Sequence, residues 1–188
     1  MTRRGNPRAR QTLVALLAAG VFLVGCAPPG EDPLLLREDG IGPLQLGRGY
    51  QETVAATRQA APETAFAGLG CGGLDEVRYS GEFAGFPVSA MAMAEQGAIV
   101  ETELALDAPT QASGEAACVE LRDRFARPFV TRFGGVDKHW VLRKPVSHEH
   151  LARIGPVVVA ARWFRTGGSC YVSAHYGYGA ASRTADWE

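Results

Sequence analysis

The chain has 188 residues, of which 46% are hydrophobic and 21% charged, a composition typical of one globular domain with short extensions. Four arginines lie among the first 25 residues, which have no acidic residue, so the remainder holds 15 basic against 20 acidic side chains and a formal charge of −5. An acidic domain without clustered Lys and Arg argues against nucleic acid as a partner, and equally against binding to anionic lipid by charge.

The N-terminus has the pattern of a secretory signal peptide. Residues 1–11 are polar and cationic, and residues 12–24 read TLVALLAAGVFLV, an apolar run without a polar face. The run is shorter than the roughly 20 apolar residues of a membrane-spanning helix, but its length and the preceding arginines fit a secretion signal. We therefore expect residues 1–25 to be a signal peptide that is removed.

The stretch Leu23-Val24-Gly25-Cys26 resembles the lipobox of bacterial lipoproteins. In that family the Cys thiol receives a diacylglyceryl group, the signal peptide is cut just before it, and the new amine is often acylated, for example with palmitate. The resemblance implies that Cys26 is the lipid-attachment residue and the first residue of the mature protein. Two or three acyl chains hold a protein stably on a membrane, whereas one does so only marginally. The alternative is a plain secreted protein in which Cys26 is incidental.

Residues 26–39 are expected to be the lipidated N-terminus and a flexible tether. The segment APPGEDP, residues 27–33, holds three prolines, a glycine and two acids, a composition that cannot form a core. In the enterobacterial sorting pattern, Asp after the lipidated Cys retains a lipoprotein in the inner membrane. Here Ala27 follows Cys26, so the resemblance implies an outer-membrane anchor, with residues 40–188 as a single domain in the periplasm.

The first half of this domain predicts a helix followed by three strands. The helix begins after the Gly47–Gly49 break and stops at Ala61-Pro62, and residues 63–73, rich in Gly and Ala, predict a loop. The expected strands are residues 77–79, 86–93 and 98–106. In the third strand the even-numbered residues from 100 to 106 are Val, Thr, Leu and Leu, whereas Glu101 and Glu103 point to the other face, which we expect to be solvated.

The second half repeats this order. A helix with Ser113 as N-cap runs to Gly134-Gly135, and Pro128 within it predicts a kink or an earlier end. Its apolar stripe is formed by Cys118, Leu121, Phe125 and Phe129. The expected strands are residues 139–143, 154–164 and 170–178. In the last of these, Cys170, Val172, Ala174 and Tyr176 share a face.

The order of helix, three strands, helix, three strands predicts an α+β fold. Two helices would pack on one face of an antiparallel sheet to form a two-layer domain. The same order is consistent with an αβββ-αβββ repeat, which is visible in the elements and only weakly in residue identity.

The segment IGPLQLGRGYQETVAA resembles the start of a group of small envelope proteins. Leu44, Leu46, Gly47 and the run Gln51–Val54 match outer-membrane assembly lipoproteins of the BamE/SmpA type and β-lactamase-inhibitor-like domains. Arg48 replaces their usual Met, and the helix lacks their terminal Leu-Gly-x-Pro. Because these families mostly bind proteins, the resemblance implies a binding module rather than an enzyme.

With Cys26 lipidated, three cysteines remain in an oxidising compartment, so we expect one disulfide and one unpaired thiol. Sequence alone leaves three pairings open among Cys71, Cys118 and Cys170. Cys118 and Cys170 both lie on apolar faces, which favours that pair and leaves Cys71 over. A redox or nucleophilic Cys71 is the functional alternative, but the chain has no CxxC motif.

His148-Glu149-His150 is the run that most resembles a set of metal ligands. Two histidines two residues apart on an extended segment project to one side, and zinc would need His139 or His175 to complete its shell. The alternative, which the sequence favours, is a solvated polar loop between two strands. No metal or other cofactor is therefore assigned.

Three hypotheses of function follow. The first is a lipid-anchored periplasmic domain that binds a protein or another envelope component through an uncovered sheet face. The second is a small metal-binding or hydrolytic protein that uses His148 and His150, and the third is a structural role without a specific partner. No motif for a nucleophilic hydrolase, a metalloprotease or a nucleotide-binding loop occurs, so the first hypothesis is preferred.

Overall fold

The computed structural model describes residues 32–70 and 72–184, so the expected signal peptide, Cys26 and Cys71 lie outside the described residues. The fold of the described part is α+β, with three helices and one large antiparallel sheet. The elements in chain order are β1 (Leu36–Arg37), β2 (Gly40–Ile41), β3 (Leu44–Gln45), α1 (Tyr50–Ala60), β4 (Phe66–Leu69), β5 (Asp75–Phe83), β6 (Phe86–Glu95), β7 (Ala98–Leu106), β8 (Thr110–Gln111), α2 (Glu115–Phe133), β9 (Lys138–Arg143), β10 (Ser147–Ile154), β11 (Val157–Phe164), β12 (Ser169–Gly177) and α3 (Tyr178–Thr184). None of the helices in the described part of the chain is long and apolar enough to cross a membrane.

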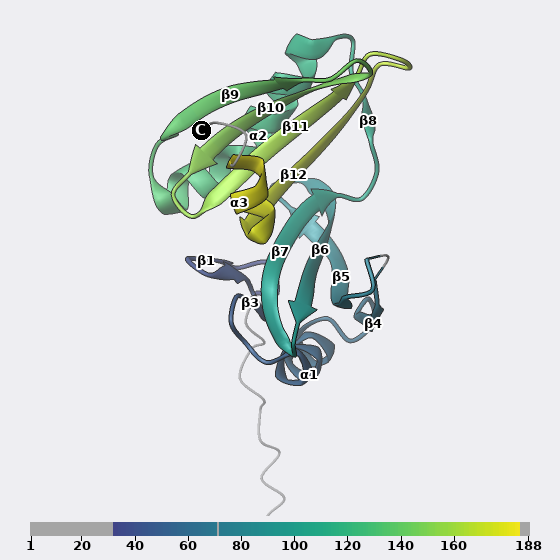
Figure 1. Ribbon diagram of the computed structural model, residues 1–188, viewed down its shortest axis with the longest axis vertical. Helices are drawn as coiled ribbons and strands as arrows, with labels where there is room; N and C mark the ends of the chain where they lie inside the picture. Colours follow the sequence, from purple (N-terminus) through teal and green to yellow (C-terminus); the bar gives the residue numbers. More distant parts are fainter. Residues whose placement is uncertain (1–31, 71, 185–188) are drawn as a thin grey trace, which may run out of the picture.

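The large sheet consists of two antiparallel meanders that meet at its centre (Figure 1). The strand order is β4-β5-β6-β7-β12-β11-β10-β9, and the short strand β8 also pairs with β12. The two meanders are joined by the pairing of β7 with β12, whose register sets Glu103 opposite His175 and Leu104 opposite Ala174. Strands β1, β2 and β3 form a separate small sheet.

One face of the large sheet carries the main core. Helix α2 packs on β10, β11 and β12, and the predicted stripe is confirmed as its buried face. The buried stripe residues are Cys118, Leu121, Phe125 and Phe129. Strand alternation is also confirmed for β12 and for the second half of β7, since Leu104, Leu106 and Tyr176 lie in the same cluster.

The predicted ends of α2 are partly wrong. The helix begins at Glu115 with Gly114 as its N-cap, and no side-chain hydrogen bond caps it, so Ser113 does not have the expected role. Pro128 lies inside the helix, which continues to Phe133. Gly134 then ends it, as predicted, with a φ of 97°, a conformation that favours glycine.

A third helix, α3, covers the opposite face of the sheet and was not predicted. It packs on β12, β7 and β11, and Ala180 joins Leu151, Val158 and Ala160 in a second, smaller core cluster. Figure 1 shows α3 on the near side of the strands and α2 behind them. The expectation of only two layers is therefore wrong in this part of the sheet.

The folded domain starts earlier than the predicted boundary at residue 40. Leu34 and Leu36 are buried in the main core, and the Tyr79 hydroxyl donates a hydrogen bond to the carbonyl of Pro33. Burial raises the pKa of Tyr79, so this hydroxyl keeps its proton and remains a donor. The proline-rich composition of residues 27–33 suggested a tether, but two of the three leucines that follow it are part of the core.

Each half of the chain has a strand that the sequence did not predict. β4 lies within residues 63–73, where Gly and Ala suggested a loop, and β10 contains His148-Glu149-His150, which is not the solvated loop expected. The single strand expected over residues 154–164 is divided, because Gly155 (φ 54°) and Pro156 form the turn between β10 and β11. Each long helix is therefore followed by a meander of four strands instead of three.

Cys118 of α2 and Cys170 of β12 form a disulfide that links helix to sheet, the pairing that the apolar faces favoured. Their Cα atoms are 5.5 Å apart, and both residues are fully buried. The bond closes a loop across 52 residues of sequence, which restricts the unfolded chain.

Replacing both cysteines, Cys118→Ala with Cys170→Ala, should lower the free energy of unfolding by about 2–4 kcal/mol. Denaturant unfolding of the full chain in detergent measures this loss, and reduction of the wild type should produce a similar one. Cys71→Ser is the matched control and should change stability by less than about 0.5 kcal/mol. A large loss in the control and none in the double variant would contradict the pairing.

Candidate functional site

The two histidines that the sequence singled out lie on β10 and bind the first residue of α2. His148 Nδ1 lies 2.9 Å from Glu115 Oε2, and His150 Nε2 lies 2.5 Å from Glu115 Oε1. These hydrogen bonds lower the pKa of Glu115 below its ordinary value, so the carboxylate stays charged. The arrangement ties the start of α2 to the sheet. Metal binding by His148 and His150 stays a hypothesis, and it would have to compete with Glu115 for both of these nitrogens.

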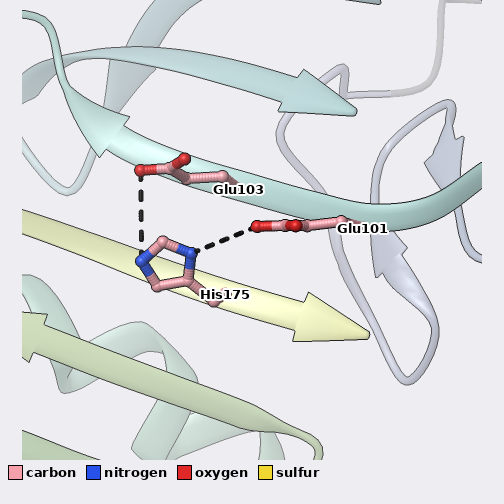
Figure 2. A group of neighbouring side chains, drawn as sticks. All are labelled: Glu101, Glu103 and His175. Atoms are coloured by element: carbon pink, nitrogen blue, oxygen red, sulfur yellow. Dashed lines mark ion pairs between the residues drawn. The ribbon is translucent and has the colours of Figure 1, made fainter. Parts of the chain in front are cut away.

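A second group of titratable side chains lies at the centre of the sheet, on the face opposite α2 (Figure 2). Glu101 and Glu103 project from β7 and His175 projects from β12. One ligand-type atom from each residue lies within 4.8 Å of the other two, and in the described part of the chain this is the one set of three His, Cys, Asp or Glu residues with that spacing.

The imidazole of His175 lies between the two carboxylates, with one nitrogen toward each (Figure 2). Nδ1 is 3.9 Å from Glu101 Oε1, and Nε2 is 4.0 Å from Glu103 Oε1. Both distances exceed hydrogen-bond length. Nε2 is hydrogen-bonded to Ser173 Oγ at 2.7 Å, whereas Nδ1 has no hydrogen-bond partner although His175 is only 1% exposed.

The expected solvated face of β7 is largely covered. The side chains of Glu101 and Glu103 are 18% and 17% exposed. The carboxyl group of Glu101 lies against Gly179 in α3, where a Cβ atom would come within 2.2 Å of Oε1. The alternation placed both acids correctly on the face away from the main core, but the sequence did not indicate that α3 would pack over it.

A β-bulge positions Glu101. The pairing of β6 with β7 shifts between Met93, which faces Glu101, and Ala94, which faces Ile99, so Val100 is an extra residue. As a result Ile99 is buried in the core and Val100 is only half-buried, in contrast to the predicted alternation. Bulges of this kind often redirect a side chain next to a functional site.

A buried ion-pair network lies beside this cluster and holds the end of α3. Glu149 of β10, 4% exposed, contacts Arg183 Nη1 of α3 at 2.7 Å and Arg162 Nη2 of β11 at 3.3 Å. These residues line a cavity of about 30 Å³ together with Tyr171 and Ser173, a volume close to that of one water molecule. Burial, and then the charge of Glu103, raise the pKa of Tyr171 to about 12, so its hydroxyl stays protonated.

The outer face of β4, β5 and β6, which we call the open face, is the third candidate site. It is formed by Phe66, Arg78, Ser80, Ser89 and Met91. Phe66 is 44% exposed, and the Arg78 guanidinium lies 4.7 Å from its ring centroid. A surface depression of about 480 Å³ runs over this face as far as Tyr171.

Chemically, the three sites differ. Glu115 and its two histidines form a group whose members hydrogen-bond one another, the Glu101–Glu103–His175 cluster can hold a cation, and the open face can bind by contact. The sequence suggested His175 only as an additional ligand for His148 and His150, and the structure places it on the other face of the sheet. The signal available in the sequence was that Glu101, Glu103 and His175 all occupy the polar face of strands whose other face is apolar.

Comparisons of the chain with protein-family models, with curated proteins and with solved structures find no match. The lipobox and the likeness to BamE/SmpA-type proteins therefore stay expectations from the sequence.

Glu115→Gln should remove the charged acceptor between His148 and His150 and lower the free energy of unfolding by about 1 kcal/mol, since the carboxylate is 32% exposed and partly screened. A carboxylate with a lowered pKa stabilises the fold above its ordinary pKa of 4.5, and this advantage is lost as the pH falls through the lowered value. Unfolding measured between pH 2 and pH 6 should show wild type and variant converging at the acidic end. A difference that stays constant over this range would contradict the role of the charge.

Proposed function

We propose that this chain is a lipid-anchored protein of the cell envelope, held on the outer membrane through Cys26, whose periplasmic domain binds a protein or another envelope component. The observation that carries the binding role is the open face. Helix α3 covers β7, β11 and β12 on that side of the sheet, whereas β4, β5 and β6 expose an aromatic ring beside an arginine. Aromatic residues and arginine are enriched among the residues that contribute most to protein interfaces.

The edge of the sheet next to the open face supports the same proposal. In the described chain β4 is the terminal strand, and its sequence Phe66-Ala67-Gly68-Leu69 holds no charge. Leu69 is 75% exposed. Strand β9, at the other edge, holds Lys138 and Arg143, and charged residues of this kind protect an edge from pairing with another chain. A partner strand added to β4 would therefore meet an unprotected edge and the open face together.

The distance between the anchor and the domain limits where the partner can lie. Five residues separate Cys26 from residue 32, and an extended segment of that length spans at most about 20 Å. Lipidation at Cys26 would thus keep the domain close to the membrane surface, and the partner would be a protein or envelope component within that reach.

We further propose that the two longer helices share one face of the sheet and that the chain holds an internal repeat. We place α1 and α2 on the same face of the sheet, because Val54 of α1 and Phe125 of α2 belong to one core cluster. The strand order, in which β4 to β7 are followed by β12 to β9, supports an internal repeat of one helix and its meander. In such a repeat the edge strands β4 and β9 would be corresponding elements, although β4 is uncharged and β9 carries basic residues.

A photo-crosslinking residue at Ser80, on the open face, should capture a specific partner in the native envelope, whereas the same residue at Glu120, on the exposed side of α2, should not. Phe66→Asp should weaken capture from Ser80 about tenfold, because it places a carboxylate in the contact. Val130→Asp is the matched control, since Val130 is a similarly exposed apolar residue of α2. Equal capture from both positions, or no effect of Phe66→Asp, would exclude the open face as the binding surface.

The anchor has a separate test. Wild-type chain should partition into the detergent phase because of its acyl chains, and Cys26→Ser, with its signal peptide cut elsewhere, should remain in the aqueous phase. If the wild type also stays aqueous, the lipoprotein assignment fails while the binding role of the domain stays testable by crosslinking.

A further inference from the structure

We propose that Glu101, Glu103 and His175 form a binding site for a divalent transition-metal cation, with zinc as the best fit. This site is distinct from the His148–Glu115–His150 contact and from the open face. The proposal rests on four features of the cluster: the unpaired nitrogen of His175, the second contact of its ring, the spacing of the ligand atoms and the identity of the ligands.

The first feature is the nitrogen of His175 that has no hydrogen-bond partner, Nδ1. With Nε2–H donating to Ser173 Oγ, Nδ1 of His175 carries a lone pair directed at Glu101 Oε1, 3.9 Å away. A buried lone pair that faces a carboxylate is repelled by it. If Nδ1 instead carries a proton, its N–H has no acceptor within hydrogen-bond distance. A cation between Nδ1 and the carboxylate satisfies both groups at once.

The second contact of the ring has the form found around protein-bound metals. A metal-ligating histidine almost always donates its other N–H to a neighbouring acceptor, which fixes the tautomer and the ring orientation. Ser173 Oγ lies 2.7 Å from Nε2 and occupies that position. Ser173 is itself 4% exposed, so it is a fixed partner.

The spacing of the ligand atoms is the third feature. Zinc holds nitrogen and oxygen ligands at about 2.0–2.2 Å in a tetrahedron, so neighbouring ligand atoms lie about 3.3–3.6 Å apart. Nδ1 of His175 lies 3.9 Å from Glu101 Oε1, too long for a hydrogen bond and close to that spacing. Glu103 Oε1 lies 4.0 Å from the other ring nitrogen, Nε2, and one ligand atom of each of the three residues lies within 4.8 Å of the other two. Rotation of the two carboxylates toward Nδ1 would bring the ligand atoms to the distances that zinc requires. The Glu101 carboxyl group fits beside α3 because residue 179 is a glycine without a Cβ atom.

The fourth feature, the chemical identity of the three ligands, indicates which metal would bind. One imidazole and two carboxylates suit zinc, and also manganese or iron(II), better than they suit calcium, which takes oxygen ligands alone. Three protein ligands leave a fourth tetrahedral position, as in zinc sites that bind water or a substrate. The carboxylates of Glu101 and Glu103 are still 18% and 17% exposed, so water can reach this position.

The test uses the full chain, purified in detergent, freed of metal with a chelator and titrated with Zn²⁺ by calorimetry. Wild type should bind one zinc ion, and Glu101→Gln and Glu103→Gln should each weaken the affinity about 100-fold or more. Ser173→Ala should weaken it about tenfold, as is typical when the partner of a ligating histidine is lost. His148→Gln combined with His150→Gln is the matched control and should leave the affinity unchanged.

Circular dichroism of each variant checks the fold, and X-ray absorption of zinc-loaded wild type provides a readout that needs no variant. The expected shell is one imidazole nitrogen with oxygen ligands. Absence of stoichiometric zinc binding by wild type, two imidazole ligands in the shell, or loss of binding in the His148 and His150 control would overturn the proposal. Equal affinity of wild type and the glutamine variants would also overturn it, because Glu101 and Glu103 would then not be ligands.

Discussion

The pairing of β7 with β12 is the constraint on which the rest of the molecule depends. It joins strands that are about seventy residues apart in sequence, and it is the only contact through which the two meanders become one sheet in the described chain. The same register sets Leu104 against Ala174 on the core face and Glu103 against His175 on the other. A shift of one residue in this pairing would exchange the two faces of the strand. The β7–β12 register therefore determines both the core contacts and the position of the titratable cluster.

This constraint explains which parts of the molecule the sequence could predict. Local periodicity identified the stripe of α2 and the inward faces of β7 and β12, because each depends only on alternation within one element. It could not predict which strands lie side by side, so Glu101 and Glu103 were expected in solvent and not beside His175. The strand β10 was missed for a related reason. Its polar residues predict a loop, but Glu115 of α2 and the arginines of β11 and α3 satisfy them within the fold.

Two groups of buried charge lie on the α3 face of the sheet, and they are stabilised in different ways. Glu149 is almost fully buried, but Arg162 and Arg183 both contact it, so its charge is compensated by neighbouring cations. Glu101 and Glu103 both face one imidazole, at distances too long for hydrogen bonds. Removing charged groups from water costs free energy that only close pairing offsets. The central cluster is therefore a less completely paired site than the network beside it, which is the expected property of a place that takes up a cation.

The cluster and the open face are also continuous. Met91 of β6 pairs with Arg78 on one side and with Glu103 on the other. One residue, Met91, therefore separates the arginine of the open face from the carboxylate of Glu103 on the same face of the sheet. A bound divalent cation would cancel two negative charges at the margin of the surface proposed for a partner. Any partner sensitive to that charge would bind with a different affinity in the metal-loaded state. By thermodynamic linkage the partner would then change the affinity for the metal by the same factor, so the two sites would act as one even though no side chain is shared between them.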